Sequence, residues 1–162
     1  MKKVIKQLSS IPGWRTQRKI VVFESDDWGS IRMPSSETFN RLSSLDVDLV
    51  SGDSERYNRY DSLASKEDLG LLFEVLTSVK DQNGRAAVFT PVSLVANPDF
   101  AKIETSNFKV YHYEVFTETL KRYQRESAFD YWKLGIEEGV FVPQFHGREH
   151  LNVAAWMRKL SN

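Results

Sequence analysis

The sequence contains no cysteine, and this absence excludes several kinds of functional site. Without a thiol the chain cannot form disulfide bonds, use a cysteine nucleophile, or build a zinc or iron–sulfur site on thiolates. A domain of this length buries about 70% of its unfolded surface when it folds, so it needs neither disulfides nor a structural metal for stability. Any chemistry must come from carboxylates, imidazoles, hydroxyls, lysine or arginine.

Long apolar runs and an excess of charge of one sign are also absent. The longest apolar stretches, such as Ile20–Phe23, have the length of strands, whereas a membrane-spanning helix needs ~20 apolar residues. The 22 Lys and Arg residues balance the 22 Asp and Glu residues, and a nucleic-acid or acidic-membrane partner usually requires a basic excess. No apolar stretch follows the basic N-terminus to make a secretory signal. We therefore expect a cytoplasmic domain without nucleic-acid or membrane partners.

The chain does contain an alternation of strand and helix patterns. After an amphipathic lead-in over residues 1–18, apolar runs that become polar predict three strands buried on both faces, at residues 19–29, 86–92 and 140–145. Apolar residues at helical spacing predict helices over residues 37–45, 65–82, 116–123, 129–136 and 152–160. The polar segment 46–64 between them is expected to be a long loop. The alternation is typical of an α/β fold with a parallel sheet and outer helices.

Polar clusters follow the predicted strands, at Ser25–Asp27, Asn97–Asp99 and His146–His150. In parallel sheets, functional residues gather at the carboxyl ends of the strands. Adjacent carboxylates at a buried strand end repel one another and lose hydration, and a bound cation offsets this cost. Two imidazoles and one carboxylate would leave coordination positions open on a catalytic metal ion, and the second carboxylate could act as a general base.

Each cluster taken alone also has a simpler explanation. Asp26 and Asp27 could form a solvated turn or a helix N-cap, and His146 and His150 could be a surface or core pair. Their joint occurrence directly after strand-like segments favours the metal site. His112, which lies between aromatic residues, is interpreted as structural.

The two strongest clusters resemble motifs of a known family. Phe23-Glu-Ser-Asp26-Asp27-Trp-Gly29 looks like the first motif, Thr-Phe-Asp-Asp-Gly, of the polysaccharide deacetylases of the NodB-homology type (carbohydrate esterase family 4). His146-Gly-Arg-Glu-His150 is similar to the second motif of that family, His-(Ser/Thr)-x-x-His. Between them, the segment 85–90 resembles the family's Lys-Ala-Thr-Phe-Phe strand.

This resemblance implies a partial or distorted (β/α) barrel of the NodB glycoside hydrolase/deacetylase type. It makes Asp26 the catalytic base, and Asp27, His146 and His150 the ligands of a divalent metal, most often zinc. The implied reaction is the hydrolysis of an N- or O-acetyl group from a sugar by a metal-activated water. An acetylated carbohydrate would then be the substrate.

The sequence departs from the family pattern in three ways. Trp28 stands between the aspartate pair and Gly29, and Gly147 replaces the Ser or Thr of the second motif. The later motifs, which supply an arginine for the base, an acidic and aromatic wall, and a general acid, have no counterpart in this sequence. We therefore expect residues 1–162 to form one deacetylase-like domain truncated on its C-terminal side, and the resemblance leaves its activity open. A small sheet with two free edges also predicts homo-oligomers or marginal stability.

Two other functions fit parts of the sequence. A non-catalytic fragment could bind metal or carbohydrate, with Trp28, Tyr57 and Tyr60 stacking on sugar rings beneath the segment 46–64. The second alternative is an H-x-x-E-H zinc peptidase with Glu149 as its base. That motif must lie on a helix, which Pro143 and Gly147 disfavour, and it leaves the aspartate pair without a role.

Overall fold

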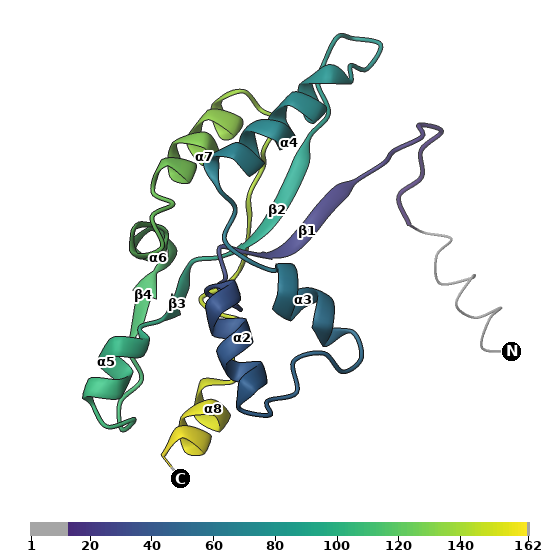
Figure 1. The fold of residues 1–162 in the computed structure, drawn as a ribbon. Helices are drawn as coiled ribbons and strands as arrows, with labels where there is room; N and C mark the ends of the chain where they lie inside the picture. Colours follow the sequence, from purple (N-terminus) through teal and green to yellow (C-terminus); the bar gives the residue numbers. More distant parts are fainter. Residues whose placement is uncertain (1–12, 162) are drawn as a thin grey trace, which may run out of the picture.

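A parallel sheet of three strands lies at the centre of the protein (Figure 1). The computed structural model describes residues 13–161, so most of the expected lead-in, residues 1–12, lies outside the described residues. The strands are β1 (Phe23–Trp28), β2 (Phe89–Leu94) and β5 (Gln144–Gly147), with β2 in the middle. The parallel pairing confirms the expected mixed α/β class.

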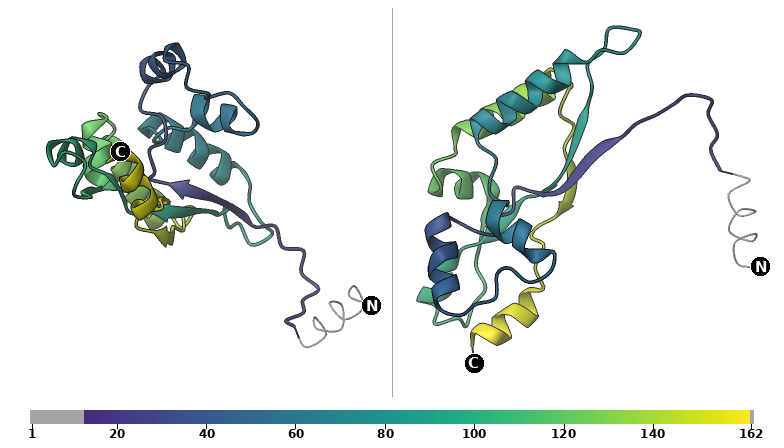
Figure 2. Two further views of the ribbon diagram at one scale, coloured as in Figure 1. Left: turned by 90° about the horizontal axis from the view of Figure 1, so that it is seen from below. Right: turned by 45° about the vertical axis from the view of Figure 1, so that its right-hand side comes forward.

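Helices lie along the sheet and beyond the ends of its strands. The helix α4 (Lys66–Ser78) packs against α7 (Ser127–Glu137) on one side of the sheet. The helices α2 (Ser36–Ser44), α3 (Ser54–Tyr60) and α8 (Val153–Leu160) gather near the carboxyl ends of the strands (Figure 2). The chain also forms α5 (Phe100–Thr105) and α6 (Phe116–Arg122).

The core between the sheet and the α4–α7 pair is rich in aromatic rings. Phe141 is fully buried and contacts the rings of Phe73, Phe89 and Trp132. Aromatic pairs of this kind contribute about 0.5–1.5 kcal/mol each beyond the burial of their surface. The core therefore fixes β2 and the segment that precedes β5 against the helices, upstream of the polar strand ends.

Local sequence signals define where several helices begin. The side chain of Ser35 caps α2 and that of Asn152 caps α8. Ser65 and Asp68 form a reciprocal capping box at the start of α4. Side-chain oxygens satisfy the free N–H groups of the first turn in each case, so the expected helix starts are confirmed.

Other predictions differ from the structure. The helix α4 ends at Ser78, before the expected end at residue 82, because the chain there enters a turn closed by an antiparallel bridge between Lys80 and Ala86. The segment 46–64 contains α3 and is not simply a loop. A short antiparallel pair of β3 (Ala96–Pro98) and β4 (Tyr113–Val115) was not predicted. Three-residue strands are too short to give a periodic pattern.

The three-stranded sheet is open. The edge strands β1 and β5 do not meet, so the described part of the chain forms no closed barrel. Within residues 13–161, no helix combines the length and the apolar character required to cross a bilayer. Association of two copies through the free edges stays a prediction.

The packing of α7 on the core can be tested at Gly135. A Cβ atom at this position would lie 2.4 Å from Cζ of Phe73 and 2.8 Å from Cβ of Phe141. We expect Gly135→Ala to lower the free energy of unfolding in urea by about 1–3 kcal/mol, because overpacking forces the neighbours apart. Gly70→Ala is the matched control: its Cβ meets only Tyr131, at 3.4 Å, and alanine favours a helix by up to about 1 kcal/mol. Equal stability of the two variants would contradict the described packing.

Candidate metal centre

An irregularity in β1 presents the aspartate pair. Ser25 pairs with Pro91 and Trp28 pairs with Ser93, so β1 carries one more residue than β2 over this stretch. Pro91 has no N–H to donate to the ladder, which favours an interruption at this point. Bulges of this kind re-aim side chains and are frequent beside active sites. Asp26 and Asp27 therefore lie where the regular pairing of β1 fails.

A second irregularity lies on the other side of β2. Ser93 pairs with Phe145 and Leu94 pairs with Gly147, so His146 is the additional residue in β5. Gly147 has a φ of +147°, a value that side-chain-bearing residues rarely adopt. This backbone conformation explains why residue 147 is a glycine, since a Ser or Thr at this position would be strained.

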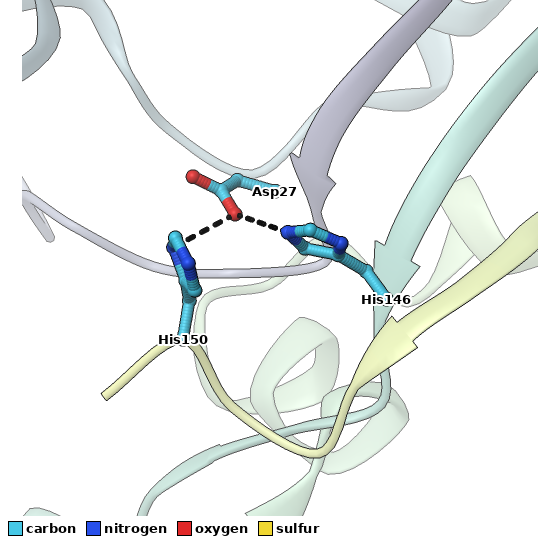
Figure 3. Close-up of side chains that lie close together, drawn as sticks. All are labelled: Asp27, His146 and His150. Carbon is cyan, nitrogen blue, oxygen red and sulfur yellow. Dashed lines mark ion pairs between the residues drawn. The ribbon is translucent and has the colours of Figure 1, made fainter. Parts of the chain in front are cut away.

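The two irregular strands bring Asp27, His146 and His150 together (Figure 3). Oδ1 of Asp27 lies 3.5 Å from Nε2 of His146 and 3.3 Å from Nδ1 of His150. Bonds of about 2.0–2.2 Å to a tetrahedral zinc ion place ligand atoms ~3.4 Å apart. All three ligand atoms lie within 4.8 Å of one another. These three residues are thus close enough to hold a metal ion, whereas the third histidine, His112, is not part of the cluster.

The oxygen at the centre of this cluster has an unusual environment. Oδ1 of Asp27 is buried and accepts no hydrogen bond from any residue between 13 and 161. A buried carboxylate oxygen without a donor loses its hydration without compensation. Asp27 also has a φ of +61°, in the left-handed region that costs energy for a residue with a side chain. Asp27, the residue that would ligate the metal, therefore has both a buried carboxylate oxygen and a strained backbone.

Asp26, the predicted base, lies on the more exposed side of the same strand end. Asp26 and Asp27 line one pocket of about 260 Å³, together with Asp61 and Ser62. A second pocket of about 280 Å³ is lined by Asp27, His150 and Trp156, among others. Two pockets therefore adjoin the cluster.

Asn97 holds the loop that follows Asp27. Its side chain is buried; Oδ1 accepts a hydrogen bond from the Ile31 N–H at 2.9 Å, and Nδ2 donates to the Gly29 carbonyl at 2.8 Å and to Thr119 at 3.2 Å. The sequence placed Asn97 in a polar cluster after a strand but gave no sign of these contacts. In the structure it lies in β3 and fixes the backbone next to the centre.

Arg32 and Asp61 also adjoin the centre, and the sequence gave no reason to select them. Nη2 of Arg32 lies 3.9 Å from Oδ2 of Asp27, and its Nε lies 3.4 Å from Oδ2 of Asp61. Burial raises the pKa of Asp61 above the usual value; the charge of Arg32 opposes this shift and that of Asp27 adds to it. The segment 46–64 thus contributes a carboxyl side chain close to Asp27.

The three aromatic residues expected to stack on sugars have other environments. The ring of Trp28 packs against Phe89, Trp132 and Phe141 of the core. The guanidinium groups of Arg32 and Arg56 lie over the ring of Tyr57. Tyr60 is 75% exposed. Trp28 contacts the aromatic core and Tyr57 contacts the two arginines, so Tyr60 is the most exposed of the three rings.

The H-x-x-E-H segment does not form a helix. His146 and Gly147 lie in β5, and α8 begins only at Val153. Both oxygens of Glu149 accept hydrogen bonds from Arg148, one of them at 2.6 Å. The helical geometry required for an H-x-x-E-H peptidase is therefore absent from residues 146–150, and the carboxylate of Glu149 is occupied.

Comparison of the chain with protein-family models, with curated proteins and with solved structures finds no match. The structure alone therefore supports the site.

The role of Asn97 gives a prediction for stability. In Asn97→Ala, the Ile31 N–H and the Gly29 carbonyl lose their partner in a partly buried place, and we expect a loss of about 1–3 kcal/mol in the free energy of unfolding in urea. Asn83→Ala, in an exposed turn, is the matched control, and we expect it to change stability by less than about 0.5 kcal/mol. Similar effects of the two variants would show that Asn97 does not hold this loop.

Proposed function

We propose that the protein is a metal-dependent hydrolase that resembles polysaccharide deacetylases and removes N- or O-acetyl groups from a sugar. The observation that carries this proposal is the buried Oδ1 of Asp27, which accepts no hydrogen bond within residues 13–161 and faces a nitrogen atom of each of two imidazoles. In this proposal the three-stranded sheet belongs to a distorted (β/α) barrel.

The donor set fits a divalent cation, most simply zinc. One carboxylate oxygen and two imidazole nitrogens are ligands that zinc prefers, and three protein ligands are typical of catalytic rather than structural zinc sites. Unless a cation or a proton lies between them, the electron-rich Oδ1 of Asp27 faces each of the two imidazole nitrogens at 3.3–3.5 Å. A bound cation would satisfy all three atoms and would relieve the uncompensated burial of Oδ1.

The chain's own residues have separate roles in the proposed reaction. When bound, the metal would lower the pKa of a water molecule and polarise the acyl carbonyl oxygen. Asp27, His146 and His150 hold the ion, and Asp26 accepts the proton of the attacking water as general base. Asp26 suits this role because it is more exposed than Asp27 and lines the same pocket. The acylated sugar would enter through that pocket.

A binding protein without turnover is the second candidate function. It rests on the same three-residue cluster, which can hold an ion whether or not a reaction follows. Such a protein would still bind metal through the same three ligands. Metal binding therefore tests the site, and acetate release separates the two functions.

The first test is metal binding. We expect the purified protein, once stripped of metal with a chelator, to bind Zn²⁺ in calorimetry. His146→Ala should weaken this binding at least about 100-fold, because a direct ligand is lost. Zinc at 100 times its Kd should stabilise the wild-type protein by about 2.7 kcal/mol, as expected when the ion binds only the folded form.

His112→Ala is the matched control for this test, because His112 lies outside the cluster. It should leave the affinity for zinc unchanged. A wild-type protein that binds no divalent metal, or a His146→Ala variant that binds zinc as tightly as the wild type, would refute the metal centre.

The second test separates the two carboxylates proposed as bases. We expect Asp26→Asn to reduce acetate release from acetylated amino sugars at least about 100-fold while zinc affinity stays within a few-fold, because the general base is lost and the ligands remain. Glu149→Gln should retain most of the activity. Loss of activity in Glu149→Gln alone would contradict the deacetylase mechanism. Zinc binding without acetate release by the wild type would favour the binding function.

A further inference from the structure

The side chain of Arg32 connects the segment 46–64 to the metal centre. Tyr57, in α3, lies beneath the Arg32 guanidinium, whose Cζ atom is 5.1 Å from the centre of the ring. Asp61, directly after α3, lies 3.4 Å from Nε of the same group. The other end of the guanidinium approaches Oδ2 of Asp27, at 3.9 Å from Nη2. Arg32 therefore links α3 to the aspartate of the centre.

The two oxygens of Asp27 face different partners. Oδ1 faces His146 and His150, whereas Oδ2 faces Arg32. A carboxylate that turned about its terminal bond could present both oxygens to a metal ion and would occupy one more coordination position. A cation fixed on the Oδ2 side opposes this rotation, because it attracts that oxygen away from the ion.

We propose that Arg32, held by Tyr57 and Asp61, is a positioning residue of the metal centre that keeps Asp27 bound through Oδ1 alone. This inference rests on the proposed function, since it assumes that a metal ion binds at Asp27. It assigns a role to the segment 46–64, which holds the guanidinium group of Arg32 through Tyr57 in α3 and through Asp61. One-oxygen binding leaves the coordination position that a catalytic metal needs for water.

Charge alone would give the opposite effect, which makes the proposal testable. A guanidinium beside a metal ligand repels the cation, so its removal would tighten metal binding if repulsion decided the outcome. Asp61 offsets much of that repulsion, because it forms the closer of the two ion pairs with Arg32. The Arg32–Asp61 pair then affects the metal mainly by orienting the carboxylate of Asp27. Removal of the arginine should therefore weaken metal binding, as for other groups that orient metal ligands.

The experiment compares Arg32→Met with Arg56→Met in the full chain. Both guanidinium groups lie over Tyr57 with their Cζ atoms 5.1 Å from the ring centre, and of the two only Arg32 has ion pairs with Asp27 and Asp61 in the described structure. The affinity for Zn²⁺ is measured by calorimetry, and the visible absorption spectrum of the Co²⁺-loaded protein reports the number of ligands around the ion. Asp61→Asn provides a second variant, which keeps the guanidinium group of Arg32 but removes its ion pair with residue 61.

We expect Arg32→Met to weaken zinc binding about 10- to 100-fold and to shift the Co²⁺ spectrum towards the weak bands of higher coordination. Asp61→Asn should change both readouts in the same direction. Arg56→Met should change neither, and the metal-free variants should melt within a few degrees of the wild type because Arg32 is partly exposed.

Unchanged or tighter zinc binding in Arg32→Met, with an unchanged Co²⁺ spectrum, would overturn the proposal while the metal centre stands. Equal losses in Arg32→Met and Arg56→Met would also overturn it, because they would show a general effect on Tyr57 and α3. A wild-type protein that binds neither Zn²⁺ nor Co²⁺ would instead refute the proposed function itself, and this inference with it.

Discussion

The arrangement at the strand ends depends on one electrostatic constraint: a buried carboxylate oxygen meets two imidazole nitrogens with no donor of its own among the described residues. Side chains on the two edge strands must reach over β2 to meet, since β1 and β5 do not pair with each other. Regular pleating would not direct them there. The additional residues in β1 and β5 interrupt the ladder on either side of β2 and allow Asp27 and His146 to converge.

Contacts with the neighbouring structure stabilise this strained arrangement. Asp27 adopts a left-handed backbone conformation, which persists only when the surroundings hold it in place. The buried amide of Asn97 fixes the loop that follows on one side. The Arg32–Asp61 pair lies on the other side, at Oδ2. The centre is thus supported by contacts from β3 and from the region after α3, both remote in sequence from β1.

Much of this could be predicted from local sequence. Three apolar runs predicted the parallel strands, but the burial expected on both faces is wrong for the first run, since Ile20–Phe23 is 51–75% exposed. The helix starts expected near residues 37, 65 and 152 lie at the caps Ser35, Ser65 and Asn152, because capping acts within a few residues. The two histidines of the cluster could be predicted because His146 and His150 are close in sequence and follow a predicted strand. The contact of Asn97 with Ile31 spans 66 residues, and no local periodicity encodes it.

The same distinction explains why Arg32 and Asp61 were not found. In the sequence, Arg32 is one of many balanced charges, and Asp61 belongs to a polar segment that reads as a solvated loop. Their proximity to Asp27 follows from the short helix α3, whose seven residues are too few for a clear periodic signal. A charge pair that arises from tertiary packing can be recognised only once the elements that carry it are placed.

Trp28 shows how the residue between the aspartate pair and Gly29 fits the structure. The residue follows Asp27 directly, and its ring lies within 5.4–6.0 Å of Phe89, Phe141 and Trp132. At Gly29, with φ +84°, a Cβ atom would lie 2.7 Å from the carbonyl oxygen of Leu94, so only glycine fits after the tryptophan. The bulky residue between the aspartates and the glycine therefore anchors the end of β1 in the aromatic core. Because Trp28 is fixed there, the strained residue before it cannot relax without moving a core ring, and Asp27 stays directed at the two histidines.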